Sequence, residues 1–214
     1  MTEAAARRRP GPARTLSRHQ VVAAALEIMR SDGLKSVGFR SVAMRLGVDP
    51  KALYTYVADK DDLLTGMYDE TVSRLDLPQS GDRRPPAEQL LALTVSMRAI
   101  FLDNIELVHL AAPKIDVHST QDEARAIWST LRAVQPDPAL AAELYLNLIQ
   151  LAIGSATESA RFAKNRDLRA AVLAELESTG PADFVAAARA MGAVDRDQAF
   201  AKLVRQTIEL AQGR

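Results

Sequence analysis

A turn of four residues, Gly47-Val48-Asp49-Pro50, most constrains how this chain can fold. Gly47 can take the positive φ that ends a helix, and Asp49 can cap a following helix whose first turn accommodates Pro50. Apolar residues recur at helical spacing on both sides, over residues 39–46 and 50–57. Two short helices joined by a tight turn are therefore predicted. The side chains expected to face inward are Phe39, Val42, Ala43, Leu46, Leu53 and Val57.

Two more helices are predicted to flank this pair. Ser17 and Gln20 form a capping box at the start of the first, which ends at Gly33. Asp59 can cap the second. Residues 15–68 are therefore expected to form an N-terminal domain built on a three-helix helix-turn-helix, with a fourth helix beginning at its end.

The rest of the chain, residues 69–214, has helical periodicity after a Pro- and Gly-containing linker at 76–87. Helices are predicted near residues 87–103, 105–112, 119–134, 138–163, 166–177, 182–191 and 196–212. No alternation long enough for a strand is present. The predicted fold class is all-α, with a C-terminal helical domain after the helix-turn-helix domain.

Charge is distributed unevenly, although the formal net charge is zero. Residues 1–60 hold eleven Lys and Arg against five Asp and Glu, and the remainder is correspondingly acidic. A basic end on an acidic chain is typical of a protein that meets a polyanion with that end, and a solvated tail would give the same pattern. Residues 1–14, with Arg7-Arg8-Arg9 and Arg14, are predicted to form a disordered basic arm that either enters a minor groove or acts as an electrostatic tail.

The predicted helix at 50–57 has an outer face suited to DNA. Its members are Lys51, Ala52, Tyr54, Thr55 and Tyr56. A cation and hydroxyl groups can contact phosphates and base edges, while aromatic rings and a methyl group suit thymine methyl groups. In a helix-turn-helix the first helix supports the second, which enters the major groove. The motif therefore predicts a DNA-binding domain.

The segment from Gly38 to Leu64 resembles the DNA-binding segment of TetR-family regulators. The shared features are the Ala43-x-x-Leu46-Gly47-Val48 turn, the aromatic pair Tyr54 and Tyr56, and Lys60 followed by Leu63-Leu64. The resemblance covers residues 16–68. It implies a homodimeric transcription regulator that binds operator DNA and responds to a small-molecule effector.

The resemblance also implies a role for each residue of the motif. Arg40, Lys51 and Ala52 would contact bases or the backbone beside them. Tyr54, Thr55, Tyr56 and Lys60 would contact phosphates and sugars, with Tyr54 also packing on a thymine methyl group. Arg14 is a further candidate through the basic arm. Tyr54 or Tyr56 could instead be a core aromatic, and Lys60 a solvated lysine.

Two C-terminal helices are candidates for a dimer surface. The helix at 138–163 is apolar almost all round, which predicts burial on more than one side. The helix at 196–212 repeats apolar residues at spacings of three and four. TetR-type proteins pair two such helices from each subunit into a four-helix bundle, whereas the pattern alone is equally consistent with monomer core.

The remaining helices can enclose an effector pocket. The candidate lining residues are Met97, Phe101, His109, Trp128, Tyr145, Asn147 and Phe162, with Asn104, Gln150 and Glu158 as further polar contacts. Each aromatic or methionine could equally be core. The stripe of Asn147, Gln150, Gly154 and Glu158 could face the pocket, the partner or solvent.

One position departs from the tetracycline-responsive namesakes of the family. An ungapped extension of the resemblance from Lys60 places Asp76 where those sensors carry a drug-binding histidine, and residues 69–80 contain no histidine. A tetracycline–magnesium effector is therefore not expected.

Other function classes find no support in the sequence. No phosphate-binding, dinucleotide-binding or hydrolase motif is present, there is no cysteine, and His109 and His118 are poorly spaced for a metal. We therefore predict no catalytic residues, no metal, no cofactor and no membrane partner, in a cytoplasmic protein. A repressor released by an inducer is the favoured function. An activator of the same fold, or a helical small-molecule-binding protein without DNA-binding activity, is the alternative.

Overall fold

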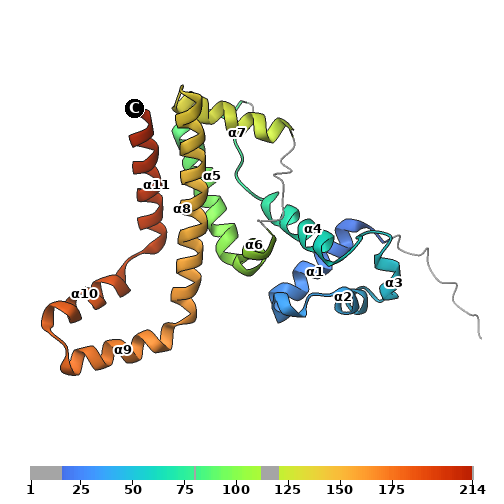
Figure 1. The fold of residues 1–214 in the computed structure, drawn as a ribbon, viewed down its shortest axis with the longest axis horizontal. Coiled ribbons are helices and arrows are strands. Elements are labelled where there is room, and N and C mark those ends of the chain that lie inside the picture. The colour runs from blue at the N-terminus through green and yellow to red at the C-terminus, as the bar shows by residue number, and fades with distance from the viewer. Residues whose placement is uncertain (1–15, 80, 112–120, 214) are drawn as a thin grey trace, which may run out of the picture. The chain divides into compact units, whose positions relative to one another are not determined.

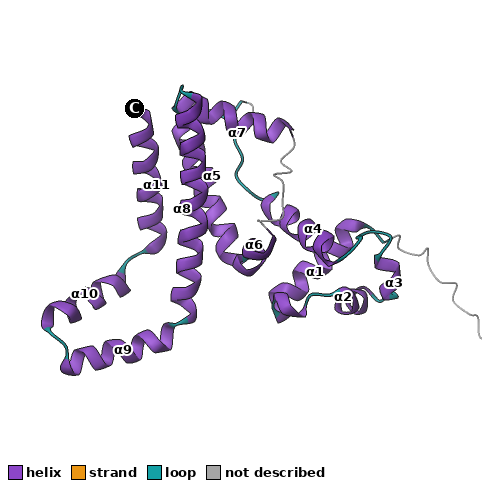
Figure 2. Ribbon diagram, in the orientation of Figure 1, coloured by secondary structure: helices purple, strands orange, loops and turns teal. Residues whose placement is uncertain are grey.

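The structure is a computed structural model that describes residues 16–79, 81–111 and 121–213. These residues form helices and connecting turns and contain no strand, which confirms the all-α prediction (Figures 1 and 2). The chain divides into two units, residues 1–67 and 68–214. The predicted basic arm, including Arg14, lies outside the described residues, as does His118.

The first unit contains the predicted helix-turn-helix. Its helices are α1 (Arg18–Asp32), the 3-10 turn η1 (Leu34–Ser36), α2 (Phe39–Leu46), α3 (Pro50–Leu53) and the start of α4 (Lys60–Val72). Gly47 has a φ of 69° and ends α2, while Asp49 accepts a 2.8 Å hydrogen bond from the backbone N–H of Lys51. Ser17 and Gln20 form the predicted capping box.

The third helix is shorter than predicted. It ends at Leu53 rather than Val57, and the chain continues through turns whose backbone N–H groups bond to carbonyls two to four residues back. The Tyr54-Thr55-Tyr56-Val57 run consists of aromatic and β-branched residues, which have poor helix propensity. Leu53 and Val57 are nevertheless both buried, so this segment is anchored at each end.

The second unit is arranged around α8 (Pro138–Lys164). Its other helices are α5 (Pro86–Asp103), α6 (Ile105–Ala111), α7 (Gln121–Val134), α9 (Arg166–Thr179), α10 (Ala182–Ala193) and α11 (Arg196–Gln212). α8 packs against α5 and α11, through a buried stripe at spacings of four: Leu144, Leu148, Ala152 and Ala156. The helix α8 has 27 residues and contains an 18-residue window with a mean hydropathy of 1.3, so by length and composition alone it could cross a membrane. The buried stripe accounts for part of this apolar character.

A buried arginine ties three helices of this unit together. Arg98 on α5 donates to the hydroxyls of Ser155 (2.8 Å) and Ser159 (3.1 Å) on α8, and pairs with Asp197 on α11 at 2.7 Å. Its guanidinium also lies over the ring of Phe200, 5.1 Å from the centroid. A buried cation is costly unless it is paired and hydrogen-bonded, and these contacts meet that requirement.

Packing of α4 on α1 requires a glycine at position 66. A Cβ atom there would lie 2.9 Å from Cγ2 of Val22, whose branched side chain has little rotamer freedom, and 3.3 Å from the Arg18 guanidinium. We expect Gly66→Ala to lower the free energy of unfolding by about 1 kcal/mol, because overpacking costs roughly 1–3 kcal/mol and the gain in helix propensity offsets up to about 1 kcal/mol.

The measurement is denaturant unfolding followed by circular dichroism. Gly192→Ala is the matched control, because this helical glycine has open space around it and should gain up to about 1 kcal/mol. If Gly66→Ala and Gly192→Ala had the same free energy of unfolding, the close packing of α4 on α1 at position 66 would be contradicted.

Candidate DNA-binding surface and effector site

The predicted DNA-contacting side chains lie on the outside of the first unit. Lys51, Tyr54 and Thr55 are exposed, and Ala52 and Tyr56 are half-buried. Outside this segment, Arg40 on α2 and Lys60 at the start of α4 are exposed. Since Leu53 and Val57 are buried beneath them, the recognition segment (residues 50–57) is held to the unit by its apolar face and presents its polar face outward.

One recognition side chain is positioned by a ring from the preceding helix. The rings of Phe39 and Tyr54 stack with their centroids 4.6 Å apart and an angle of 24° between their planes. Phe39 was predicted to face inward; it is half-buried and carries this stack. Tyr54 is 60% exposed, so the core-aromatic alternative does not describe it.

An ion pair that we term the Arg18–Asp62 latch holds the end of the recognition segment. The guanidinium of Arg18 on α1 donates to the carbonyl of Tyr56 at 3.0 Å and to both carboxylate oxygens of Asp62 on α4, at 2.7 and 3.0 Å. The same carboxylate accepts the backbone N–H of Ala58 at 2.7 Å. The latch therefore joins α1, the end of the recognition segment and the start of α4.

The latch changes the acidity of Asp62. The hydrogen bond from Arg18 stabilises the carboxylate and holds the pKa of Asp62 below its ordinary value of 3.8, although partial burial opposes this shift. Asp59 caps the same helix as predicted, with its carboxylate accepting the Asp62 N–H at 2.8 Å. Sequence reasoning missed Arg18, because a pairing across 44 residues leaves no signal in the local pattern.

Sequence reasoning also missed Met44. It is 80% exposed and lies one helical turn after Arg40 on α2. Its exposed apolar side chain extends the outward face of the unit beyond the predicted polar residues.

The predicted effector residues do not surround one cavity among the described residues. Met97 and Phe101 are buried in the core of the second unit, and Tyr145 packs against that core. Burial raises the pKa of the Tyr145 phenol, and the pKa of Tyr68, which interacts with Tyr145, is raised in the same way. Met97, Phe101 and Tyr145 are therefore the predicted effector residues that lie together, in the core of the second unit.

The other four predicted effector residues lie apart from that core. His109 is exposed on α6, with its Nε2 3.0 Å from the hydroxyl of Thr157, and Trp128 is exposed on α7. Phe162 lies between the guanidinium groups of Arg169 and Arg196. Asn147 is exposed on α8, and its role, like that of the other three, stays a prediction.

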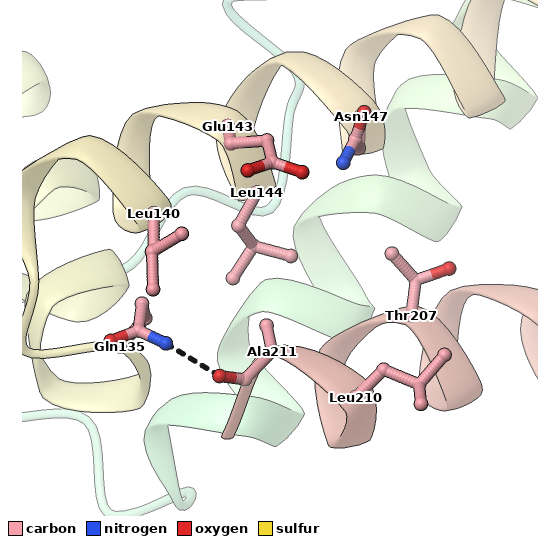
Figure 3. A pocket seen from close by; sticks show the side chains of 8 residues that line it. All are labelled: Gln135, Leu140, Glu143, Leu144, Asn147, Thr207, Leu210 and Ala211. Carbon is pink, nitrogen blue, oxygen red and sulfur yellow. Dashed lines mark hydrogen bonds between the residues drawn. The ribbon is translucent and has the colours of Figure 1, made fainter. Parts of the chain in front are cut away.

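Two hollows follow the surface between α8 and α11. One, of about 150 Å³, is lined by residues that include Asn147 and Leu144, and beside it Gln135 donates to the carbonyl of Ala211 at 2.6 Å (Figure 3). The other, of about 430 Å³, includes Gln150, Gly154 and Glu158 in its lining. The polar stripe predicted on α8 therefore faces these hollows rather than the core.

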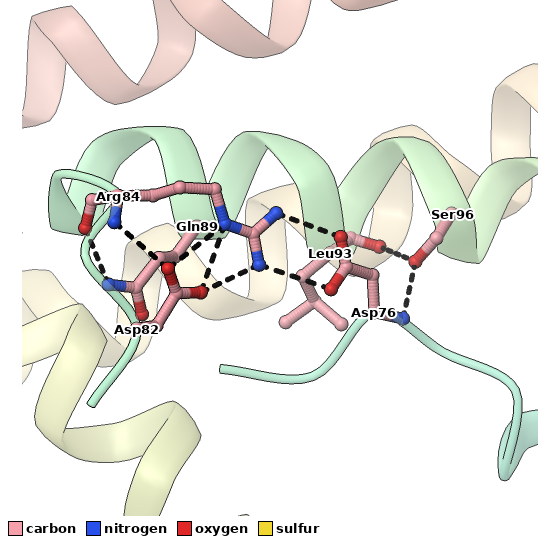
Figure 4. A network of polar contacts seen from close by, with 6 residues as sticks. All are labelled: Asp76, Asp82, Arg84, Gln89, Leu93 and Ser96. Atoms are coloured by element: carbon pink, nitrogen blue, oxygen red, sulfur yellow. Dashed lines mark hydrogen bonds and ion pairs between the residues drawn. The ribbon is translucent and has the colours of Figure 1, made fainter. Parts of the chain in front are cut away.

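Asp76 is engaged in an ion-pair network between α4 and α5. Its carboxylate pairs with Arg84 at 2.9 Å, and Arg84 also pairs with Asp82 at 2.7 Å (Figure 4). Hydrogen bonding from Arg84 lowers the pKa of both carboxyl groups. The backbone N–H of Asp76 bonds to Ser96 on α5. Asp76 therefore anchors the connection to α5.

Within the described ranges, no cluster of side chains could hold a metal ion.

The fold and the exposed recognition segment define the class of helix-turn-helix transcription regulators. The family described as "Bacterial regulatory proteins, tetR family" matches residues 21–67. The helix-turn-helix unit of this chain is therefore of the TetR type over those residues. Because that family consists of regulatory proteins, the prediction that the chain is no enzyme is confirmed.

Curated relatives match the N-terminal part of the chain. An HTH-type transcriptional regulator of Saccharopolyspora erythraea is 29% identical over 100 residues, which cover 46% of this chain and 42% of that protein. The HTH-type transcriptional repressor DrrR1 of Streptomyces coeruleorubidus is 44% identical over 64 residues, or 29% of this chain and 24% of that protein. The matches thus span less than half of the length of both relatives.

Solved structures share the fold over almost the whole chain. Apo ActR from Streptomyces coelicolor has a TM-score of 0.75 at 22% identity, covering 92% of this chain and 97% of that one. TetR from Acinetobacter baumannii has a TM-score of 0.68 at 20% identity, covering 91% and 96%. The helical arrangement is therefore common to these proteins.

The latch predicts a specific acid sensitivity. We expect Arg18→Ala and Asp62→Asn each to lower the free energy of unfolding by about 1 kcal/mol near neutral pH, because both remove a partly exposed, bidentate pair. Since the pKa of Asp62 is lowered in the folded state, the stabilisation is present above pH 3.8 and is lost as the pH falls through the folded pKa.

Thermal unfolding followed by circular dichroism, at a series of pH values below and above 3.8, checks this expectation. Wild-type protein should lose more stability than Asp62→Asn across that acidic window. Arg45→Ala is the control, because Arg45 makes an exposed 3.3 Å pair with Glu27 and should contribute little. Parallel acid profiles for wild type and Asp62→Asn would show that the latch contributes no stability.

Proposed function

We propose that this protein is a homodimeric repressor that binds a palindromic operator and is released from it by a small-molecule inducer. The observation that carries the proposal is the recognition segment, which exposes Lys51, Tyr54 and Thr55 while Leu53 and Val57 fix it from below. A preformed segment of this kind needs no ordering on contact with DNA, so little binding energy is lost. A repressor is favoured over an activator because the relative DrrR1 is a repressor.

The DNA contacts divide by chemistry. Arg40, Lys51 and Ala52 read base edges or the adjacent backbone, whereas Tyr54, Thr55, Tyr56 and Lys60 bind phosphates and sugars. These last four residues set the register of the protein on the duplex. The basic arm with Arg14 adds contacts outside the major groove.

The homodimer forms through α8 and α11. Both helices expose large apolar side chains: Leu146 is 56% exposed on α8, and Leu203 and Leu210, which line the two hollows, are 45% and 69% exposed on α11. Large exposed apolar residues gathered on two adjacent helices are typical of an interface. A two-fold dimer places its recognition segments on successive major grooves, about 34–36 Å apart or farther.

The effector binds the second unit. Crystal structures of ActR hold actinorhodin and (S)-DNPA, and a TetR variant holds minocycline, so aromatic polycyclic molecules are suitable probes. Met97, Phe101 and Tyr145, which share one core, are the favoured contacts among the predicted residues. Binding shifts the dimer toward a geometry whose recognition segments no longer match two grooves. The protein acts in the cytoplasm, where its operator is.

Selection of bound sequences from random duplex DNA tests the DNA-binding function. We expect an inverted repeat, because a two-fold dimer presents two identical reading surfaces. Recovery of no enriched sequence would favour the alternative of a helical small-molecule-binding protein.

Substitutions separate the phosphate and base contacts. Lys60→Ala should weaken binding to every sequence and reduce the slope of log affinity against log salt concentration by about 1, because one phosphate contact is lost. Lys51→Ala should instead relax preference at one base position by about 1–3 kcal/mol. Fluorescence anisotropy with operator and scrambled duplexes at several salt concentrations distinguishes the two. An unchanged salt slope for Lys60→Ala would contradict its phosphate role.

Effector action is tested by titrating actinorhodin into the protein–operator complex. Minocycline serves as a comparison that should not release the operator, because Asp76 stands where the tetracycline sensors carry a drug-binding histidine. Release from operator requires that the inducer bind the free dimer more tightly than the operator-bound dimer. An active compound should bind Met97→Ala or Tyr145→Phe protein more weakly, with operator affinity unchanged. An inducer with equal affinity for free and operator-bound protein would rule out this mechanism.

A further inference from the structure

Met44 on α2 is the most exposed large apolar side chain among the described residues, with 80% of its surface accessible. A single apolar residue on a protein surface is common and is not by itself an interface. What distinguishes Met44 is its place in the helix-turn-helix unit, one turn after Arg40 and just before Gly47, which ends α2. Met44 therefore lies between a predicted base contact and the turn that leads to the recognition segment.

The contacts of α2 with its neighbours show which face carries Met44. At about 3.6 residues per turn, Arg40 lies about 100° round the helix from Phe39, and Met44 lies about 140° round. Arg45 lies about 240° round. Phe39 stacks on Tyr54 of the recognition segment, whereas Arg45 pairs with a carboxylate on α1 at 3.3 Å. Arg40 and Met44 therefore share the outer face of α2, between the flank on the recognition segment and the flank on α1.

The positive charge beside this outer face is not neutralised. Arg45, on the flank that faces α1, pairs with carboxylates of that helix. Within the described part of the chain, the side chains of Arg40, Lys51 and Lys60 form no ion pair. Unpaired cations attract phosphate groups. The surroundings of Met44 therefore favour DNA over a second protein as the partner of this face.

The chemistry of a thioether limits what Met44 can recognise. The side chain has no hydrogen-bond donor and only a weak acceptor, so it cannot distinguish bases by hydrogen bonds. The apolar group that base edges present in the major groove is the C5-methyl group of thymine. A methionine side chain is unbranched, flexible and polarisable, and it adapts its shape to such a group.

We propose that Met44 is a specificity-determining residue that packs on a thymine methyl group in each half-site of the operator. The inference rests on the proposed DNA-binding function and adds a specificity contact from α2. The first helix of a helix-turn-helix crosses the DNA backbone beside the groove that the second helix enters. Met44 lies about 6 Å along this helix from Arg40, which is about two base steps of the duplex. Its thymine therefore belongs to a base pair near the one that Arg40 contacts.

The test removes the methyl group and changes nothing else in the DNA. Deoxyuridine replaces each thymine of the selected operator in turn, in both half-sites at once, and fluorescence anisotropy measures the affinity. Wild-type protein should bind about fifteenfold more weakly when the thymine that Met44 contacts is replaced, because each lost methyl contact costs about fourfold and the two half-sites multiply. Met44→Gln should bind the unsubstituted operator more weakly and show no further loss at that thymine.

The variants are chosen so that the fold is retained. Glutamine and leucine have helix propensities close to that of methionine, and position 44 is exposed. Met44→Leu keeps an apolar side chain and should keep the dependence on the methyl group. Arg45→Ala is the matched control, because it changes the next residue of α2 on the flank that faces α1 and should leave the loss at every thymine unchanged. A methyl group that Tyr54 contacts stays important in all of these proteins.

Two results would overturn the assignment of Met44 and leave the DNA-binding function standing. In one, wild type and Met44→Gln lose the same affinity at every thymine that is replaced. In the other, deoxyuridine has no effect on wild type at any position, while Met44→Gln binds operator and scrambled duplexes equally weakly, which indicates a contact with the sugar. Selection that recovers no operator would overturn the DNA-binding function itself, and the role of Met44 with it.

Discussion

The second unit depends on one constraint, which is that α8 carries more apolar surface than its own chain covers. One stripe of α8 is buried against α5 and α11. Arg98 on α5 fixes the spacing of these three helices, because it contacts Ser155 on α8 and Asp197 on α11. Leu146, on another side of α8, stays exposed. One face of this helix therefore specifies the fold of the subunit, while another face leaves apolar surface that the subunit itself does not cover.

The first unit separates support from recognition. Leu53, Val57 and the Arg18–Asp62 latch position the recognition segment, and the latch reaches it through the carbonyl of Tyr56. Lys51 and Thr55 are exposed on the other side. Because the latch also holds the first turn of α4, the recognition segment and α4 are linked by one guanidinium group.

The features that depend on a few neighbouring residues, such as caps and turns, could be predicted from the sequence. The contacts between residues far apart in the chain could not. Ser17 and Asp49 act as caps as predicted, and Gly47 ends α2, because capping and turn chemistry lie within a few residues. The early end of α3 was missed, since helical spacing of Leu53 and Val57 is also satisfied by a turn. The Phe39–Tyr54 stack, the latch and the Arg169–Phe162–Arg196 contact all join residues that are distant or lie on different elements. For the effector residues, an apolar side chain that lines a pocket has the same pattern as one that fills a core.

The use of a main-chain carbonyl by the latch has a consequence for evolution. A carbonyl is present whatever the side chain, so Arg18 can hold the recognition segment in any sequence that keeps its backbone path. The exposed reading positions can then vary without loss of the fold. Operator preference can diverge among related regulators by point substitution, while the fold that presents those positions is inherited intact.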